Sequence, residues 1–336
     1  CYTAPHWPLH ALPEDIETYR GTYRRGWDST RAARHEKLKA EGILSPDWPI
    51  SPRDPDSRDF DADPPARREW EDLRMAVYAA QVHSMDRGVG AILEALRRNG
   101  VEENTLVMFL SDNGGCAEFL NEDGNGRRWP SHYRHSARSG QTCRVGNVAG
   151  LEPGPATTFM SYDLPWANVS NSPFRLYKHW VHEGGIATPF ICRWPAGIRQ
   201  PLIHHGPCHL VDIMPTCLEL AGVRPATERD GHLLPELPGE SLVSAMCGDP
   251  DWRRAQPIFW EHEGNRAVRA GDWKLVSRTV EARNGPWELY NMEADRTELR
   301  NLADSERERV DRMSSMYERW AARCGVLPWN RGPQPQ

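Results

Sequence analysis

The feature that most constrains the fold is a long amphipathic segment followed closely by a short apolar one. From Arg67 to Asn99, apolar residues recur at steps of three and four, the period of a helix with one buried face. Gly100 follows, where helices commonly end. Thr105–Leu110 is then almost wholly apolar, as in strands of parallel sheets that are covered on both faces. The pair predicts half of a β-α-β unit and therefore an α/β fold.

The length and composition agree with a large α/β domain plus a smaller module. The chain has 336 residues, of which 39% are hydrophobic and 26% charged, as in a soluble globular protein. A net charge of −6 argues against a general nucleic-acid binder. No apolar run approaches the roughly 20 residues that span a bilayer. The 8 cysteines form no CxxC pair, which disfavours a structural zinc site and a dense disulfide framework and leaves the redox compartment open.

Further segments suggest how the chain is divided. Pro189–Trp194 is a second apolar strand candidate. Near the end, Ala267–Arg278 contains a Gly-Asp turn between two strand-like runs, and Ser305–Arg323 is an amphipathic helix. We therefore predict that residues 1–254 form a large α/β domain, the one expected to be catalytic, with a mostly parallel central sheet flanked by helices. Residues 255–336 are predicted to form a small antiparallel α+β module with a terminal helix.

Polar residues follow the first predicted strand directly. Asp112 and Asn113 come at its end, and Gly114 and Gly115 come next. In parallel α/β sheets, ligands bind beyond the carboxyl ends of the strands. A carboxylate and an amide oxygen suit a hard cation such as Ca²⁺ or Mg²⁺, and the glycines permit a sharp turn and a close backbone approach. The alternative is a simple turn, which these four letters alone favour.

Two other clusters carry candidate chemistry. One lies before the second strand and combines cations and histidines with a glycine pair: Arg175, Lys178, His179, His182, Glu183, Gly184 and Gly185. Cations beside a flexible turn can bind an oxyanion, although a solvated charged face is the alternative. The other is Ala4–Pro8, where His6 stands between prolines that restrict the backbone. A histidine fixed in this way can serve as a donor or an acid, but a lone histidine is more often structural.

The segment Asn121–Pro165 is rich in Gly, Arg and Pro and shows little periodicity. A loop of this length inside a domain is usually functional or an insertion. Trp129, Tyr133 and Trp166 can stack on a ring of a ligand, with simple packing as the alternative. We expect ligand specificity from this loop and from the C-terminal module, and neither identifies a particular substrate.

Taken together, these stretches resemble the type I, formylglycine-dependent sulfatases of the alkaline phosphatase superfamily, and the arylsulfatase-like members in particular. The matching stretches are APHWPLHA, TLVMFLSDNGG, PFRLYKHWVHEGGIATPFICRWPAGI, AVRAGDWKLVSR and WELYNMEADRTELRNLAD. Their order and spacing fit, and the resemblance covers almost the whole chain. It implies an alkaline phosphatase-like fold and hydrolysis of aryl or carbohydrate sulfate monoesters to an alcohol and inorganic sulfate.

The resemblance also implies roles for individual residues. Asp112 and Asn113 inherit the role of calcium ligands. Lys178 inherits the contact to the sulfate group, and His6 faces the sulfate or the leaving oxygen. These roles agree with the chemistry, because a metal polarises sulfuryl oxygens, a lysine stabilises their charge and a histidine can protonate the leaving oxygen. The two histidines of the second cluster are interpreted as pocket wall or as structural.

The sequence departs from the family at the nucleophile. Sulfatases convert the Cys or Ser of a Cys/Ser-x-Pro-x-Arg motif to formylglycine, and none of the 8 cysteines, nor Ser51 or Ser172, fits this motif. The family's upstream Asp-Asp pair, Lys and His are absent as well. We therefore expect an N-terminally truncated sulfatase sequence, about the C-terminal two-thirds, whose chain alone is inactive. By resemblance, the full-length protein would use Ca²⁺, require a formylglycine-generating enzyme or an anaerobic maturase, and be periplasmic or secreted.

Two alternative functions stay open. A phosphate or phosphonate ester hydrolase of the same superfamily would use a similar oxyanion pocket, and a plain Thr or Ser nucleophile would distinguish it. A non-catalytic protein that binds sulfated glycans would keep the fold without the reaction. The stretch GGIATPFICRWPAG favours the sulfatase reading over the first alternative. The presence of all four inherited site residues speaks mildly against the second.

Overall fold

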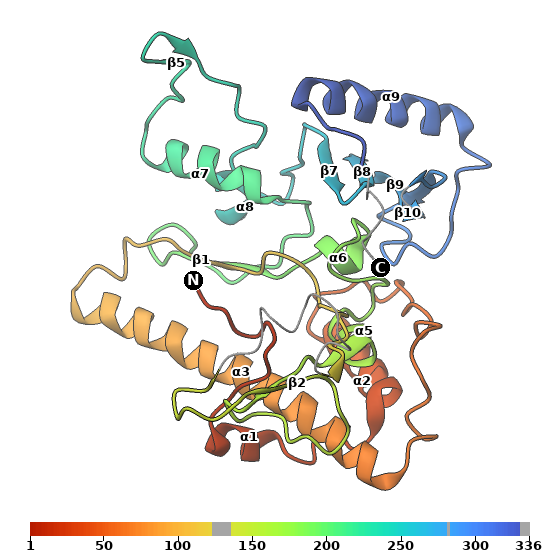
Figure 1. The fold of residues 1–336 in the computed structure, drawn as a ribbon. Coiled ribbons are helices and arrows are strands. Elements are labelled where there is room, and N and C mark those ends of the chain that lie inside the picture. Colours follow the sequence, from red (N-terminus) through yellow and green to blue (C-terminus); the bar gives the residue numbers. More distant parts are fainter. Residues whose placement is uncertain (123–135, 281–282, 330–336) are drawn as a thin grey trace. The chain divides into compact units, whose positions relative to one another are not determined.

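The chain forms two compact units, and Figure 1 colours the ribbon along the sequence, so that the segments of each unit can be found by residue number. The computed structural model describes residues 1–122, 136–280 and 283–329. The first unit comprises Cys1–Asn99 and Asp112–Ala187, and the second comprises Gly100–Ser111 and Thr188–Gln336. The predicted domain boundary at residue 255 falls within the second unit and stays a prediction.

The longest element of the first unit is α3 (Pro65–Arg98), which confirms the predicted helix. A proline begins it, where a missing N–H costs nothing. Arg97 and Arg98 lie in its last turn and complement the helix dipole. Gly100 adopts a φ of 67° just beyond the end, a conformation that favours glycine. The local signals at both ends therefore agree with the apolar period between them.

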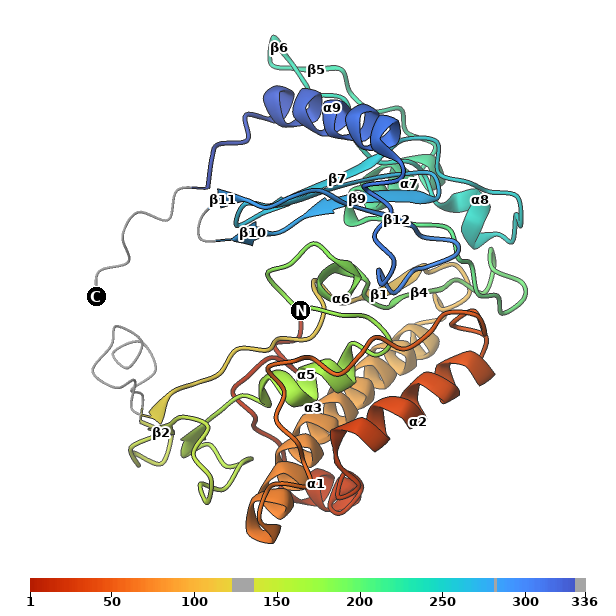
Figure 2. The same ribbon diagram turned by 90° about the vertical axis from the view of Figure 1, so that its right-hand side faces the viewer.

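The first unit also contains the helices α1 (Pro13–Tyr19), α2 (Gly26–Ala40) and α5 (Asp163–Ser170). α1 packs on α3, and α2 packs on α5 (Figures 1 and 2). β2 (Arg144–Val145) and β3 (Thr158–Phe159) form a short parallel pair. Trp166 is fully buried in the core and donates its indole N–H to Glu71 at 3.1 Å. It is thus a packing residue, whereas Trp129 and Tyr133 lie outside the described residues.

Both apolar strands that the sequence predicts are present, as β1 (Val107–Leu110) and β4 (Phe190–Arg193). They pair with each other in antiparallel register, with Val107 opposite Arg193 and Leu110 opposite Phe190. The apolar run of β1 had suggested a parallel neighbour. An antiparallel strand in an otherwise parallel sheet is common in α/β proteins, and an apolar run is compatible with either pairing. The strands were therefore predictable, but this pairing was not.

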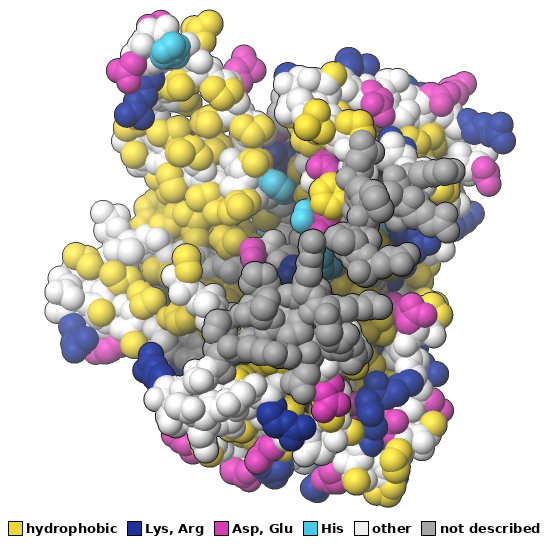
Figure 3. All heavy atoms as spheres, viewed as in Figure 1, with side chains coloured by type: hydrophobic (Ala, Val, Ile, Leu, Met, Phe, Trp, Pro, Cys, Tyr) yellow, Lys and Arg dark blue, Asp and Glu magenta, His cyan; other side chains and the backbone are white. Residues whose placement is uncertain are grey.

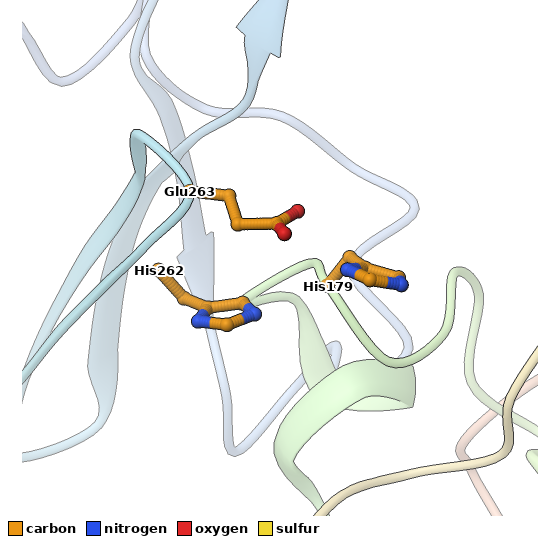
Figure 4. A group of neighbouring side chains, drawn as sticks. All are labelled: His179, His262 and Glu263. Carbon is orange, nitrogen blue, oxygen red and sulfur yellow. The ribbon is translucent and has the colours of Figure 1, made fainter. Parts of the chain in front are cut away.

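The small antiparallel module is confirmed in the second unit. Its four-stranded sheet has the order β12-β9-β8-β7. The strands are β7 (Ile258–His262), β8 (Asn265–Ala270), β9 (Trp273–Ser277) and β12 (Glu288–Asn291). Helix α9 (Arg307–Cys324) lies along this sheet, as Figure 2 shows. Met313 and Tyr317 of α9 pack on Val268, Leu275 and Leu289. His262 and Glu263 lie where β7 turns into β8, and Figure 4 draws their side chains.

The remaining elements are short. They are α6 (Glu183–Ile186), η2 (Leu210–Asp212), α7 (Ile213–Leu220), β5 (Glu228–Arg229), β6 (His232–Leu233), α8 (Val243–Met246), β10 (Thr279–Val280) and β11 (Arg283–Asn284). Hydrophobic side chains gather on the surface over α7 in Figure 3. Leu210 and Met214 there are 64% and 57% exposed. No helix within the described ranges is long and apolar enough to cross a bilayer.

A buried ion pair stabilises the C-terminal module and gives a direct test of the fold. The Lys274 Nζ lies 2.9 Å from Glu298 Oε1, and both side chains are fully buried. Lys274→Met should lower the free energy of unfolding by about 3–5 kcal/mol, because it leaves a buried carboxylate without its counter-charge. Adding Glu298→Gln should recover part of this loss. Denaturant titration checks both, with Arg229→Met in an exposed pair as the near-neutral control.

Candidate functional site

The Asp-Asn-Gly-Gly turn packs closely on the backbone of α6. The Gly114 N–H donates to the Gly185 carbonyl at 2.9 Å. A Cβ on Gly114 would overlap the Gly184 carbonyl oxygen, so only glycine fits here. The sequence had suggested that these glycines allow a close approach to a ligand. The structure shows that the backbone approached by Gly114 is that of the second glycine pair.

Lys178 lies beside the same turn. Its N–H donates to the Gly115 carbonyl at 3.0 Å, which ties the predicted sulfate-contacting residue to the predicted metal-binding turn. Leu176 and His179 flank Lys178 with φ values of 65° and 88°, in the left-handed region that bulky residues seldom adopt. Such backbone strain persists where the surrounding structure enforces it, and it is frequent at functional sites.

The Lys178 side chain belongs to a polar cluster around Glu118, a residue that the sequence analysis did not single out. The Lys178 Nζ lies 3.4 Å from Glu118 Oε1. His179, in the loop before α6 (Figure 4), donates from Nε2 to the same oxygen at 2.9 Å. The Trp7 indole donates to Oε2 at 2.8 Å. These contacts, the His179 hydrogen bond above all, lower the pKa of Glu118 to about 2, against the opposing effect of burial.

Trp7 connects this cluster to His6. The rings of His6 and Trp7 have centroids 4.6 Å apart, and His6 is exposed. His6 Nδ1 lies 2.7 Å from the Trp7 carbonyl, which can only accept, so Nδ1 donates this hydrogen bond. Gln81 of α3 donates to the Pro8 carbonyl at 3.2 Å and holds this segment on the helix. Within the first unit, His6 is thus linked to Lys178 through the contacts of Trp7 and Glu118.

Asp112 and Asn113 are suited to supply part of the coordination shell of a calcium ion. Asp112 is exposed and forms no ion pair with any residue that the structure describes. The Asn113 Nδ2 donates to the Gly114 carbonyl at 2.7 Å, which fixes the plane of the amide. A carboxylate and an amide oxygen on adjacent residues are hard ligands, and Ca²⁺ takes six to eight such oxygens. The pair can therefore supply part of the shell, and the remaining ligands must come from other groups.

The neighbouring cysteine and the second histidine are less suited to chemistry. Cys116 is buried, and this burial raises its pKa to about 11. Its thiol is therefore protonated at neutral pH, unlike a catalytic cysteine. His182 is fully buried at the start of α6. Neither residue has the exposure that contact with a substrate requires.

Glu118 and Trp7 could be found only in part from the sequence. Trp7 is within the APHWP stretch, but nothing in its neighbours indicates that its indole reaches Glu118. The two residues are separated by 111 positions. Asn171 is a further residue that was not predicted, although it lies just before the second cluster. Its importance is visible only from its side-chain contacts, which the linear sequence does not show.

Comparison with known proteins identifies the family. Residues 1–223 match the Sulfatase family, so the chain belongs to the sulfatase family. Residues 174–320 match the family described as N-sulphoglucosamine sulphohydrolase, C-terminal. The predicted resemblance is therefore confirmed at the level of the family.

Individual relatives agree. An uncharacterized sulfatase of Schizosaccharomyces pombe is 30% identical over 97% of this chain and 57% of its own length. An arylsulfatase of Klebsiella aerogenes is 34% identical over 67% of this chain and 46% of its own length. A mouse N-acetylgalactosamine-6-sulfatase is 27% identical over 65% of this chain and 32% of its own length. The chain thus spans about half the length of the first two relatives.

The solved structures confirm the fold class. The crystal structure of Ps i-CgsB in complex with k-i-k-neocarrahexaose matches 95% of this chain and 48% of its own, with a TM-score of 0.56 and 22% identity. At this level of identity the match concerns the fold alone. The α/β class of alkaline phosphatase type, with an antiparallel sheet in the C-terminal part, is the class that the sequence predicted.

The low pKa of Glu118 predicts how stability depends on pH. Because the folded pKa is about 2 and the ordinary value is 4.5, the Glu118 interactions stabilise the protein fully above that ordinary value and are lost as pH falls toward the folded pKa. At about pH 6, the free energy of unfolding of Glu118→Gln should therefore be lower than that of wild type. This deficit should shrink by about 2 kcal/mol as the pH falls to about 3. Denaturant titrations at several pH values measure this difference.

The matched control for this prediction is Glu94→Gln. Glu94 forms an exposed pair with Arg97 on α3, with both side chains at least half exposed. Its stability difference from wild type should stay nearly constant with pH, because exposed pairs contribute little. A Glu118→Gln difference as flat as that of the control would contradict the cluster described above.

Proposed function

We propose that this sulfatase-family chain provides the metal-binding turn, the sulfate-contacting lysine and the leaving-group histidine of a calcium-dependent sulfate monoester hydrolase. The observation that carries the proposal is the hydrogen bond from the Lys178 N–H to the Gly115 carbonyl. It joins the residue expected to contact the sulfate group with the turn expected to hold the metal. Both therefore keep a fixed spacing within the first unit, as charge stabilisation requires.

Each residue of the chain has a role that its surroundings support. Lys178 lies next to the Glu118 carboxylate, and a sulfate ester offers anionic oxygens that can take the place of this partner. Its ammonium would then stabilise the charge of the sulfuryl group. His6 would give the proton of Nε2 to the departing oxygen, while Nδ1 stays fixed on the Trp7 carbonyl. Trp7 and Glu118 would hold the two cationic side chains in place.

Two groups would come from beyond these residues. When bound, Ca²⁺ would polarise the sulfuryl oxygens, and a formylglycine would supply the nucleophile. Asp112 and Asn113 would hold the metal ion through their side-chain oxygens. A formylglycine-generating enzyme or an anaerobic maturase would be the partner that makes the nucleophile. By analogy with bacterial relatives, the protein would act in the periplasm or outside the cell.

We infer a sulfated saccharide or an aryl sulfate as the substrate class. The relatives support this inference by name, since they include an arylsulfatase and an N-acetylgalactosamine-6-sulfatase. The second family match, described as N-sulphoglucosamine sulphohydrolase, C-terminal, covers most of the C-terminal module, from which we expect specificity.

The function is tested by expressing the complete coding sequence together with a formylglycine-generating enzyme. We expect calcium-dependent release of inorganic sulfate from nitrophenyl sulfate or from a sulfated sugar. The chain of residues 1–336 alone should release none, because it holds no Cys/Ser-x-Pro-x-Arg motif. Faster hydrolysis of phosphate esters would favour the phosphatase alternative. Binding of sulfated glycans without turnover by the complete protein would favour the non-catalytic one.

The role of Lys178 predicts a large and specific loss. Lys178→Ala in the complete enzyme should lower kcat/KM for nitrophenyl sulfate about 100- to 1000-fold, the typical effect of removing one group that stabilises transition-state charge. Lys37→Ala, on an exposed position of α2, is the matched control and should leave the rate unchanged. A Lys178→Ala enzyme within a few-fold of wild type would remove this lysine from the mechanism.

The role of His6 predicts a dependence on the leaving group. His6→Ala should slow hydrolysis of alkyl or sugar sulfates about 100- to 10,000-fold, because their leaving oxygens need a proton. Nitrophenyl sulfate should be affected much less, since nitrophenolate leaves readily without one. Steady-state rates with both classes of ester measure the difference, and His232→Ala on an exposed position of β6 serves as control. Equal losses with both classes would argue against an acid role.

A further inference from the structure

Asn171 contacts all three turns that form the candidate site. It follows α5 directly and is 8% exposed. Its Oδ1 accepts a hydrogen bond from the Gly115 N–H at 2.7 Å. Its Nδ2 donates to the carbonyls of Leu176 and Gly184, both at 2.8 Å. One carboxamide therefore connects the metal-binding turn, the turn that leads into Lys178, and α6.

Only a carboxamide of this size can make these contacts together. It offers an acceptor and two donors at fixed angles in one plane, and all three are used on backbone groups. An aspartate would keep the acceptor for Gly115 but would direct a negative oxygen at two carbonyls. The contact to Leu176 also holds the carbonyl of a residue with a φ of 65°, a conformation that needs support from its surroundings.

Backbone hydrogen bonds already run between the turns, but each joins only two of them. The Gly114 N–H reaches Gly185, and the Lys178 N–H reaches the Gly115 carbonyl. A single hydrogen bond between two loops leaves their relative angle adjustable. Asn171 adds a buried third point that is common to all of them, which fixes their geometry.

We propose that Asn171 is a positioning residue that sets the distance between the Asp112–Asn113 pair and Lys178. The inference rests on the proposed function for the roles of those residues, while the contacts themselves do not depend on it. Residues that support metal ligands from behind typically change metal affinity or activity 10- to 100-fold when they are removed. Charge stabilisation is equally sensitive to small displacements of the charged group.

The test compares Asn171→Ala and Asn171→Asp with Asn147→Ala. Asn147 is also buried, and its side chain bonds to Ser161 and contacts none of the three turns. Hydrogen exchange of the purified protein reports on peptides that cover residues 112–116 and 175–180. Calcium affinity of the complete enzyme is measured by competition with terbium luminescence, with Asp112→Ala to confirm where the ion binds. All measurements are made well below the unfolding temperature of every variant.

We expect both Asn171 variants to speed exchange in both peptides and to weaken calcium binding about 10- to 100-fold. Asn147→Ala should lose stability without either change. In the complete enzyme, the Asn171 variants should lower kcat more than they raise KM, because alignment matters most in the transition state. Asn171→Asp should be no better than Asn171→Ala, since both lack the two donors.

The outcomes separate this inference from the proposed function. If exchange in the two peptides and calcium affinity stay at wild-type values while stability falls as in Asn147→Ala, Asn171 is merely structural and the inference is overturned. If exchange rises in both peptides but the complete enzyme binds no calcium and releases no sulfate, the proposed function fails. In that case the contacts made by Asn171 still set the geometry of the turns.

Discussion

The close contact between two glycine pairs is the constraint on which the candidate site depends. Gly114 approaches the backbone of α6 so closely that a side chain at this position would overlap the Gly184 carbonyl. This contact brings a turn that follows β1 next to a turn that leads into β4. Backbone groups make this contact, and the buried Asn171 side chain adds hydrogen bonds to both turns. The polar residues that flank the two glycine pairs are therefore held close together.

Electrostatics then determine how the charged residues of this site are arranged. Glu118 accepts hydrogen bonds from His179 and Trp7 and lies beside Lys178, so three donors converge on one carboxylate. Its pKa of about 2 means that it is ionised at any physiological pH. The carboxylate thus keeps the ammonium of Lys178 oriented while leaving it exchangeable, because a partly exposed ion pair is weak. Under the proposed function, a sulfate ester would compete with Glu118 for the same cation, which a buried pair would prevent.

Much of the fold and part of the site could be predicted from the sequence. Helix α3 and the strands β1 and β4 follow from apolar period and composition, which are local properties. The antiparallel pairing of β1 with β4 could not be derived, since pairing depends on which segments meet in space. The same limit applies to the site. Asp112, Lys178 and His6 belong to recognisable short stretches, whereas Glu118 and Asn171 act through contacts to residues that are distant in the chain or through backbone atoms, which have no signature in the sequence.

The proposed function separates residues that would do chemistry from residues that fix geometry. His6 and Asp112 are exposed, as the proposed contacts with a substrate and a metal ion require, while Asn171, Gly184 and Gly185 are buried. The buried members are neutral, so their contacts do not change with pH, and the charged members carry the pH dependence. A charged residue in the place of Asn171 would couple the geometry of the site to its own protonation. A neutral amide avoids this coupling, which explains in physical terms why a carboxamide suits a position where three backbone segments meet.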